Sequence, residues 1–492
     1  MRSHLLVLLA LVPGLHAQEA APQTPNPFVK KGEAAKTEKP PGQSYTSVVE
    51  HILVPPDDIA AWMRGNSVGE DAEKLRSLVQ GWIDEGKATL EHTVVATGVA
   101  DRKAHFSSIV ELIYPTTYEP AGTGVWPLST AFETRNTGLT TDIVAVNFKE
   151  GPRLAVWGDH VAYAGSRAWD ILSNRTKHPD DIFMPDFRSA RATWGVWQED
   201  PPNRHGKPTQ DVTDYLPVPQ ALAPDKIQLL ARIEPPPEAC GTGIPTRLVF
   251  LRGGFLEPAE TGGVAESPKH LAYEMVEVPQ AKFSAWHRSR PLAGIASGAW
   301  DFVEGVRKNG EATTITGGDG MANGSAEWRL ESIYEQIYPT EYMPSNKKTV
   351  MNRWEEPSRQ SQNGKSVVGT GVFERYQIQS LPGLDGKSLA TSFETRNAGF
   401  SLELTPSRDE SGLLMKLSAS NVVRLGDTVS RRIEVDGEWV PDCTMPLFTS
   451  NSFETTCRIP SGKWTLVGSG SRFTGLGKTD SSRCMLFFVK LE

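Results

Sequence analysis

The feature that most constrains this chain is a pair of short motifs that occurs twice. A Tyr-Pro motif recurs 224 residues downstream, and a Phe-Glu-Thr-Arg-Asn motif recurs 261 residues downstream. Ordered matches at constant offsets are the signature of a duplicated structural unit, so we predict two degenerate copies of one module. The repeated positions are Tyr114, Pro115, Phe132, Glu133, Arg135 and Asn136 in the first copy, and Tyr338, Pro339, Phe393, Glu394, Arg396 and Asn397 in the second.

Each copy has a pattern that predicts one strand, a short helical region and then a series of strands. Residues 271–278 partly alternate apolar and polar side chains, which favours a strand. Ile59, Trp62 and Met63 have the spacing of one helix face. Residues 401–404 also alternate, and Gly, Asn and Pro separate the later segments. We therefore predict an α+β fold of two tandem β-rich modules, each a short βα unit with a mainly antiparallel sheet.

Composition divides the chain into five predicted segments. Residues 1–17 have a basic start and a short apolar run, which is typical of a secretory signal peptide. Residues 18–43 are rich in Pro and Ala and are expected to be a disordered tether. We expect the first module at 44–254, a linker at 255–267 and the second module at 268–492. Export would place the protein in the periplasm or in association with the outer membrane.

Charge and cysteine content narrow the possible partners. The net charge of −8 disfavours nucleic acid, because broad binding to a polyanion needs a basic surface. No later segment has the roughly 20 apolar residues of a transmembrane helix. Export permits disulfides, and Cys443 and Cys457 are close enough in sequence to bridge a hairpin. Buried free thiols are the alternative.

No residue pattern predicts an active site, so we expect neither an enzyme nor a bound cofactor or metal. The histidines form no His-x-x-x-His array. The Gly-x-Ser-x-Gly match at 65–69 follows a helical segment, whereas a nucleophile elbow needs a preceding strand. Glu133 and Arg135 would lie on one face of a strand, as would Glu394 and Arg396. These pairs favour structural pairing with a neighbouring strand or subunit over catalysis.

The second copy carries an order of motifs that resembles the C-terminal domain of bacterial secretins. Gly399 opens an apolar strand that leads to Pro406, and Met445-Pro446-x-Phe448 follows. Residues 462–468 then begin and end with Gly before a closing apolar strand. Secretins are ring-forming channels of type II and III secretion and of type IV pili. The two repeated motifs also resemble those of uncharacterised secretin-like proteins of the Verrucomicrobia type.

The resemblance implies an exported, non-enzymatic structural or interaction protein of the cell envelope. Its expected partners are envelope proteins or further copies of itself, with peripheral association with the outer membrane. The polar segment 469–483 stands where secretins have their gate, so we expect no gated pore. Two alternatives stay open. One is an exported glycan- or ligand-binding module that uses Trp194 and Trp197, and the other is a divergent secretin that forms a secretion channel.

Overall fold

The computed structural model describes much of the chain from residue 42 to residue 492. The described part has gaps at 69–70, 120–127, 149–150, 170–181, 195, 198–216, 219, 222–224, 234–244, 257–269, 322–326, 345–349, 353–359, 363–364, 368–374, 378–387, 410–411, 436–437 and 476–477. The predicted signal peptide, nearly all of the predicted tether and most of the predicted linker therefore lie outside the described residues.

Each predicted module begins with a strand, two helices and a second strand, and a hairpin at its end completes the same layer. In module 1 (44–254) these elements are β1 (Ser44–Val54), α1 (Pro56–Gly65), α2 (Glu73–Asp84), β2 (Thr89–Val99), β10 (Ile227–Ile233) and β11 (Thr246–Phe255). In module 2 (268–492) they are β12 (His270–Pro279), α3 (Gln280–Arg288), α4 (Ala293–Lys308), β13 (Thr313–Met321), β22 (Thr465–Gly475) and β23 (Lys478–Leu491).

Four long strands lie between these elements in each module. They are β3 (Lys103–Glu119), β4 (Leu128–Phe148), β5 (Gly151–Trp169) and β6 (Ile182–Trp194) in module 1, and β14 (Trp328–Pro344), β19 (Ser388–Asp409), β20 (Gly412–Val435) and β21 (Glu438–Cys457) in module 2. The short strands are β7 (Val196–Trp197), β8 (Pro217–Val218), β9 (Gln220–Ala221), β15 (Val350–Asn352), β16 (Gln360–Gln362), β17 (Lys365–Val367) and β18 (Arg375–Gln377). The fold is α+β and mainly antiparallel, as the sequence predicts.

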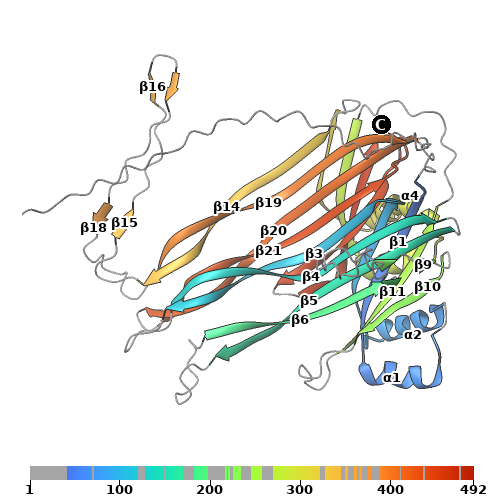
Figure 1. Ribbon diagram of the computed structural model, residues 1–492, viewed down its shortest axis with the longest axis horizontal. Helices are drawn as coiled ribbons and strands as arrows, with labels where there is room; N and C mark the ends of the chain where they lie inside the picture. Colours follow the sequence, from blue (N-terminus) through green and yellow to red (C-terminus); the bar gives the residue numbers. More distant parts are fainter. Residues whose placement is uncertain are drawn as a thin grey trace, which may run out of the picture. The chain divides into compact units, whose positions relative to one another are not determined.

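Both large sheets run through both modules (Figure 1). The helix-covered sheet has the order β10-β11-β1-β2-β22-β23-β12-β13, and the long-strand sheet has the order β14-β19-β20-β21-β3-β4-β5-β6. We expected each module to have a sheet of its own, but residues 41–492 form one compact unit. The physical reason is that an unpaired strand edge carries open hydrogen-bonding groups, and here each module covers an edge of the other.

The modules share their strand register as well as their strand order. Tyr114 lies opposite Glu133 in the hairpin β3–β4, and Tyr338 lies opposite Glu394 in the hairpin β14–β19. In both hairpins the register shifts directly after the Pro of the Tyr-Pro motif. The repeated motifs therefore mark two strands that pair with each other in each module.

One glycine in each module occupies the same special position. Gly138 has a φ of 112° and Gly399 has a φ of 120°, a region that L side chains rarely adopt. A Cβ atom at Gly138 would collide with the carbonyl oxygen of Ser108, and one at Gly399 would collide with that of Ser332. The backbone of the partner strand thus excludes any side chain at these two positions.

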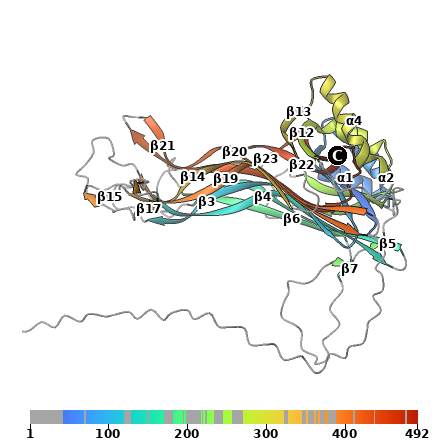
Figure 2. The ribbon, with the colours of Figure 1, turned by 90° about the horizontal axis from the view of Figure 1, so that it is seen from above.

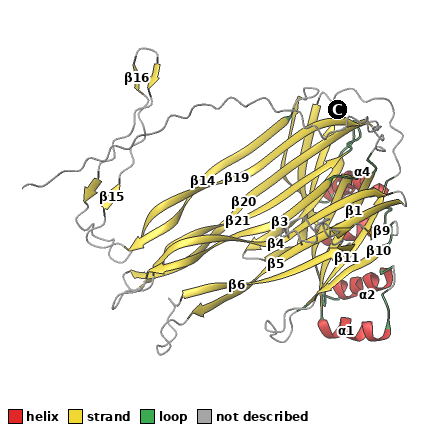
Figure 3. Cartoon of the chain, viewed as in Figure 1, coloured by secondary structure: helices red, strands yellow, loops and turns green. Residues whose placement is uncertain are grey.

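Apolar side chains fill two layers of core on opposite faces of the helix-covered sheet. Val49 and Val94 face the long-strand sheet and pack in a cluster with Phe400. Ile52 faces the other way, toward α1 and α2, and Val276 does the same beneath α3 and α4. Figure 3 shows the helices, in red, gathered beside this sheet, and Figure 2 shows the long strands extending away from them. Because both faces are covered, β1 is buried along nearly its whole length.

Candidate functional site

The repeated tyrosines have equivalent surroundings, whereas the repeated phenylalanines do not. The ring of Tyr114 lies 5.8 Å from that of Phe187, and the ring of Tyr338 lies 6.2 Å from that of Phe448, which is the equivalent residue of module 2. Phe132 packs against Tyr342 of the other module, but Phe393 is 57% exposed. The difference arises because β14 pairs with β4 at Glu341 opposite Ala131, and among the described residues no strand makes the matching contact with β19.

The repeated arginines also have different partners. Arg396 on β19 forms an ion pair with Glu111 on β3, across the boundary between the modules. Arg135 on β4 is exposed and lies over the ring of Phe187, 5.9 Å from its centroid. Glu394 accepts a hydrogen bond from the Tyr338 hydroxyl at 3.2 Å. Pro115, Pro339, Glu133, Asn136 and Asn397 occupy matching ladder positions in β3, β14, β4 and β19.

The predicted disulfide between Cys443 and Cys457 is wrong. Both thiols are free and buried, as is that of Cys484. Cys443 and Cys457 lie in one strand, β21, fourteen positions apart. At ~3.3 Å per residue their Cα atoms are on the order of 45 Å apart, whereas a disulfide needs about 7 Å or less. The stretch that we read as a hairpin is a single long strand.

The two tryptophans proposed for ligand contact lie close together in sequence but belong to different strands. Trp194 ends β6 opposite Val156, and Trp197 pairs with Pro217 in the small sheet of β7 and β8. Their side chains lie outside the described structure, so the glycan alternative stays a prediction. Within the residues that the structure describes, no helix is both long and apolar enough to cross a membrane.

The boundary between the modules in the long-strand sheet is formed by β21 of module 2 and β3 of module 1. Their ladder runs from Phe448 opposite Glu111 to Glu454 opposite His105. It covers the edge of β3, where Val110 is fully buried. This junction joins unlike edges, because β21 is the last long strand of its module and β3 is the first of the other.

The strand at the outer edge of the same sheet is β14, which is the module 2 equivalent of β3. In the part of the chain that the structure describes, β14 pairs with β19 along its length and otherwise only with β4, at Glu341 opposite Ala131. Tyr334 is 55% exposed and Ile337 is 67% exposed. Their equivalents in module 1 are Val110, which is 0% exposed, and Ile113, which is 6% exposed. Large apolar side chains thus lie in solvent on β14 at positions that a neighbouring module covers on β3.

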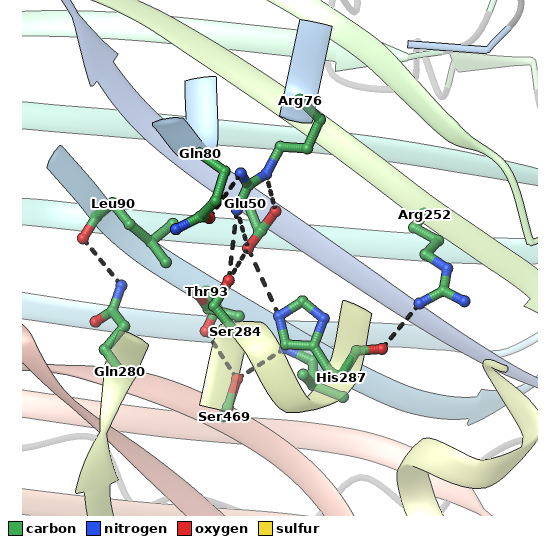
Figure 4. Close-up of polar contacts among 11 residues, drawn as sticks. Glu50, Arg76, Gln80, Leu90, Thr93, Arg252, Gln280, Ser284, His287 and Ser469 are labelled. Carbon is green, nitrogen blue, oxygen red and sulfur yellow. Dashed lines mark hydrogen bonds and ion pairs between the residues drawn. The ribbon is translucent and has the colours of Figure 1, made fainter. Parts of the chain in front are cut away.

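A buried polar cluster joins the modules on the helical side of the other sheet (Figure 4). Glu50 comes from β1 and Arg76 from α2, both in module 1, whereas Ser284 and His287 come from α3 of module 2. Arg76 donates to both oxygens of Glu50, with Nε 2.7 Å from Oε2 and Nη2 3.1 Å from Oε1. Ser284 Oγ donates to Oε1 at 2.9 Å, and His287 Nε2 lies 3.6 Å from that oxygen.

Burial and charge set the ionisation of this cluster. Burial alone would raise the pKa of Glu50, but the charge of Arg76, the nearby imidazole of His287 and the hydrogen bonds from Arg76 hold that pKa well below its usual range. Burial lowers the pKa of His287, against the opposing effect of the Glu50 carboxylate. At neutral pH Glu50 is therefore ionised and His287 is neutral.

Further contacts surround the cluster and all cross the same boundary. Gln280 Nε2 donates to the carbonyl of Leu90 at 3.0 Å. Arg252 donates to the carbonyls of His287 and Arg290 at 2.9 and 2.6 Å. The Ser284 hydroxyl donates to the Glu50 carboxylate, which Arg76 also holds, and all three side chains are buried. The cluster formed by Glu50, Arg76, Ser284 and His287, here called the Glu50 cluster, therefore links the two modules.

The repeats alone did not predict this cluster, because Glu50 has a like equivalent in Glu274 but its partners do not recur. Arg76 corresponds to Trp300 of module 2, and His287 corresponds to Met63 of module 1. A usable signal was present in single residues. Glu50 is an acidic residue directly after the apolar pair Val48-Val49 in a predicted strand, and Arg76 follows Leu75 beside the apolar stripe of its helix.

Comparisons with known proteins find little similarity. No family model matches the chain, and no curated protein matches it. One similar structure is the atomic model of the Salmonella SPI-1 type III secretion injectisome basal body proteins InvG, PrgH and PrgK, and another is the cryo-EM structure of the Salmonella SPI-1 injectisome secretin InvG. Each is 10% identical and matches 68% of this chain with a TM-score of 0.19. The matches cover 61% and 86% of the other chains, so this chain spans less than two thirds of the first. At this similarity neither structure assigns a function.

Proposed function

We propose that this chain is an exported structural protein of the cell envelope that assembles with further copies of itself. In the assembly, the junction between its two modules is repeated between chains. β6 of one copy pairs with β14 of the next, as β21 pairs with β3 inside the chain. The single observation that carries the proposal is the exposure of Tyr334 and Ile337 on β14, where the equivalent Val110 and Ile113 on β3 are buried.

The residues on the two outer edges suit this pairing. Inside the chain, Ser452 of β21 lies opposite Ser107 of β3. The equivalent residues on the outer edges are Arg191 of β6 and Glu331 of β14, so the same register places Arg191 of one chain opposite Glu331 of the next. Opposite charges in directly facing positions stabilise a ladder. The same register brings Arg135 of one copy near Glu335 of the next, at the equivalent of the ion pair between Arg396 and Glu111.

The geometry of the junction determines the kind of assembly. Unlike edges meet at the junction, so each added copy offers a new free edge of the same kind. Such heterologous contacts produce a ring when the rotation per copy closes and an open filament when it does not. The helix-covered sheet fits the same scheme, because β10 and β13 at its ends correspond to β22 and β2 at its internal junction. The single contact between β14 and β4 within the chain would be exchanged for the contact with the next copy.

The test measures the mass of the purified full chain in solution by mass photometry. It compares the unmodified protein with a variant that carries two added lysines on β14. We expect species at integer multiples of the 53.9 kDa chain mass, less any segment removed on export. Tyr334→Lys with Ile337→Lys should reduce them to the single-chain species. Val423→Lys is the matched control, since Val423 is also exposed but lies on the internal strand β20. A single-chain mass for the unmodified protein would refute the proposal, as would equal effects of the edge and control variants.

A further inference from the structure

A second polar cluster lies between the two large sheets, among strands of module 1, and is separate from the Glu50 cluster. Glu91 and His92 come from β2, and His160 comes from β5. Glu91 Oε2 is 3.7 Å from Nε2 of His92 and 3.7 Å from Nε2 of His160. The imidazole centroids of the two histidines are 5.3 Å apart. One potential ligand atom from each of the three residues lies within 4.8 Å of the others.

The local backbone explains why two neighbouring residues point to the same place. The register between β1 and β2 shifts between His51 and Ile52, so Glu91 is the additional residue of a bulge. A bulge brings consecutive side chains toward the same side of a strand, whereas a regular strand sends them to opposite faces. The carboxylate of Glu91 and the imidazole of His92 can therefore act on one centre.

The donor atoms are buried, and one of them has no hydrogen-bond partner. His92 is fully buried, and its Nε2 takes part in no hydrogen bond within the described residues, whereas Glu91 Oε2 is ion-paired with Arg247. His92 Nδ1 lies 2.7 Å from Ser471 Oγ. With Nδ1 donating to that hydroxyl, Nε2 carries a free lone pair, as in histidines that bind metal through one nitrogen and are oriented through the other.

Module 2 shows that the fold does not need these three residues. The equivalent positions hold Ile315, Thr316 and Asn421, in strands of the same order and with a register shift at the equivalent place. A buried imidazole nitrogen is costly to keep without a partner, so His92 Nε2, which lies beside a carboxylate and a second imidazole, calls for a ligand that uses it. A carboxylate oxygen and two imidazole nitrogens are a common ligand set of late first-row divalent metals, zinc above all.

One cation already lies beside these groups. Arg247 on β11 forms an ion pair with Glu91 Oε2 through Nη1, and its Nη2 is 3.2 Å from His160 Nδ1. A dication and a guanidinium repel each other, so a bound metal competes with Arg247 for the carboxylate. The equivalent of Arg247 in module 2 is Met485, so Arg247→Met introduces a side chain that the fold already accommodates at this position.

We propose that Glu91, His92 and His160 form a binding site for one divalent transition-metal ion of the zinc class, in competition with Arg247. The ion would connect β2 of the helix-covered sheet to β5 of the long-strand sheet. It would stabilise the packing of the two sheets in module 1 without taking part in a reaction. This inference is independent of the assembly of chains through β14.

The experiment uses the full chain, stripped with a chelator and then titrated with ZnCl₂ by isothermal calorimetry, with metal content after dialysis measured by mass spectrometry. We expect one tightly held Zn²⁺ per chain and a higher unfolding temperature in its presence. His92→Thr combined with His160→Asn, which installs the module 2 residues, should abolish this binding. His105→Gln is the matched control, because His105 pairs with Asp142 outside the cluster. Arg247→Met should tighten binding at least tenfold.

A second measurement needs no variant that could fail to fold. X-ray absorption at the zinc edge of the unmodified protein should show two imidazole ligands at about 2.0–2.1 Å and oxygen in the remaining positions. Absence of binding by the unmodified chain would overturn the proposal. So would sulfur ligation, binding retained in the double histidine variant, loss of binding in the His105 variant, or unchanged affinity after Arg247→Met.

Discussion

The contribution of the Glu50 cluster to stability can be tested by removing the charge of Glu50. Glu50→Gln keeps the shape of the side chain but leaves the guanidinium of Arg76, which is fully buried, without its anion. Arg76 retains a hydrogen bond to Gln80 at 3.1 Å and a longer one to Ser284 at 3.4 Å. Neither partner carries charge, so the substitution leaves an uncompensated cation in the boundary between the modules.

Two routes give the size of the effect. Arg76 loses two hydrogen bonds to a charged partner, and each contributes about 1.5–3 kcal/mol. Breaking a buried ion pair by removing one partner costs about 3–5 kcal/mol. The two estimates overlap, so we expect Glu50→Gln to lower the free energy of unfolding by about 3–5 kcal/mol. Glu50→Gln combined with Arg76→Met removes both charges and should recover most of that loss, because replacing a whole buried pair with apolar groups is often neutral.

Urea unfolding followed by circular dichroism at pH 7 measures both changes. The pKa of Glu50 is lowered in the folded state, so its contribution is present above its unfolded pKa of about 4.3 and is lost as the pH falls through the folded value. The difference between the unmodified chain and Glu50→Gln should therefore shrink only in acid well below pH 4. A loss under about 1 kcal/mol at pH 7, or a double variant no more stable than the single one, would refute this account.

Three further predictions concern single residues. Burial lowers the pKa of His287, so stability should fall as the pH drops below about 6.5, and His287→Met should reduce that slope by up to about 1.4 kcal/mol per pH unit in urea titrations at pH 5–7. Gly399→Ala should destabilise the chain by more than about 2 kcal/mol, whereas Gly305→Ala in open space on α4 should stabilise it by about 0.5–1 kcal/mol; equal thermal shifts would contradict the role given to Gly399. Burial raises the pKa of the Cys457 thiol to about 12, so a thiol reagent should label it only after unfolding, and mass spectrometry of native labelled peptides would detect any exception.

The sequence allowed the α+β class and the repeat to be predicted because both depend on local pattern. The Tyr-Pro and Phe-Glu-Thr-Arg-Asn motifs lie on strands that pair with each other, so their constant offsets reflect a shared register. Gly138 and Gly399 recur because a backbone contact excludes every other residue at both positions. Such constraints act within one module and are therefore duplicated with it.

The joining of the modules could not be predicted in this way. Whether β21 pairs with β3 depends on which edges meet in space, and no motif within either strand specifies that choice. Two polar residues at this boundary, Arg76 and His287, have the unlike equivalents Trp300 and Met63 in the other copy. The proposed metal ligands come from β2 and β5, and a search for closely spaced histidines passes over them.

The central claim is that chains pair through β6 and β14 in the register of β21 and β3. It is tested most directly by mixing an Arg191→Cys chain with a Glu331→Cys chain under mild oxidation. These positions correspond to the facing residues Ser452 and Ser107. We predict a disulfide between the two chains, identified by peptide mass spectrometry. We predict little disulfide when Ala190→Cys replaces Arg191→Cys, because residue 190 is one position along the strand and its side chain points to the other face. Equal crosslinking of the shifted pair, or none between the facing pair, would contradict the account.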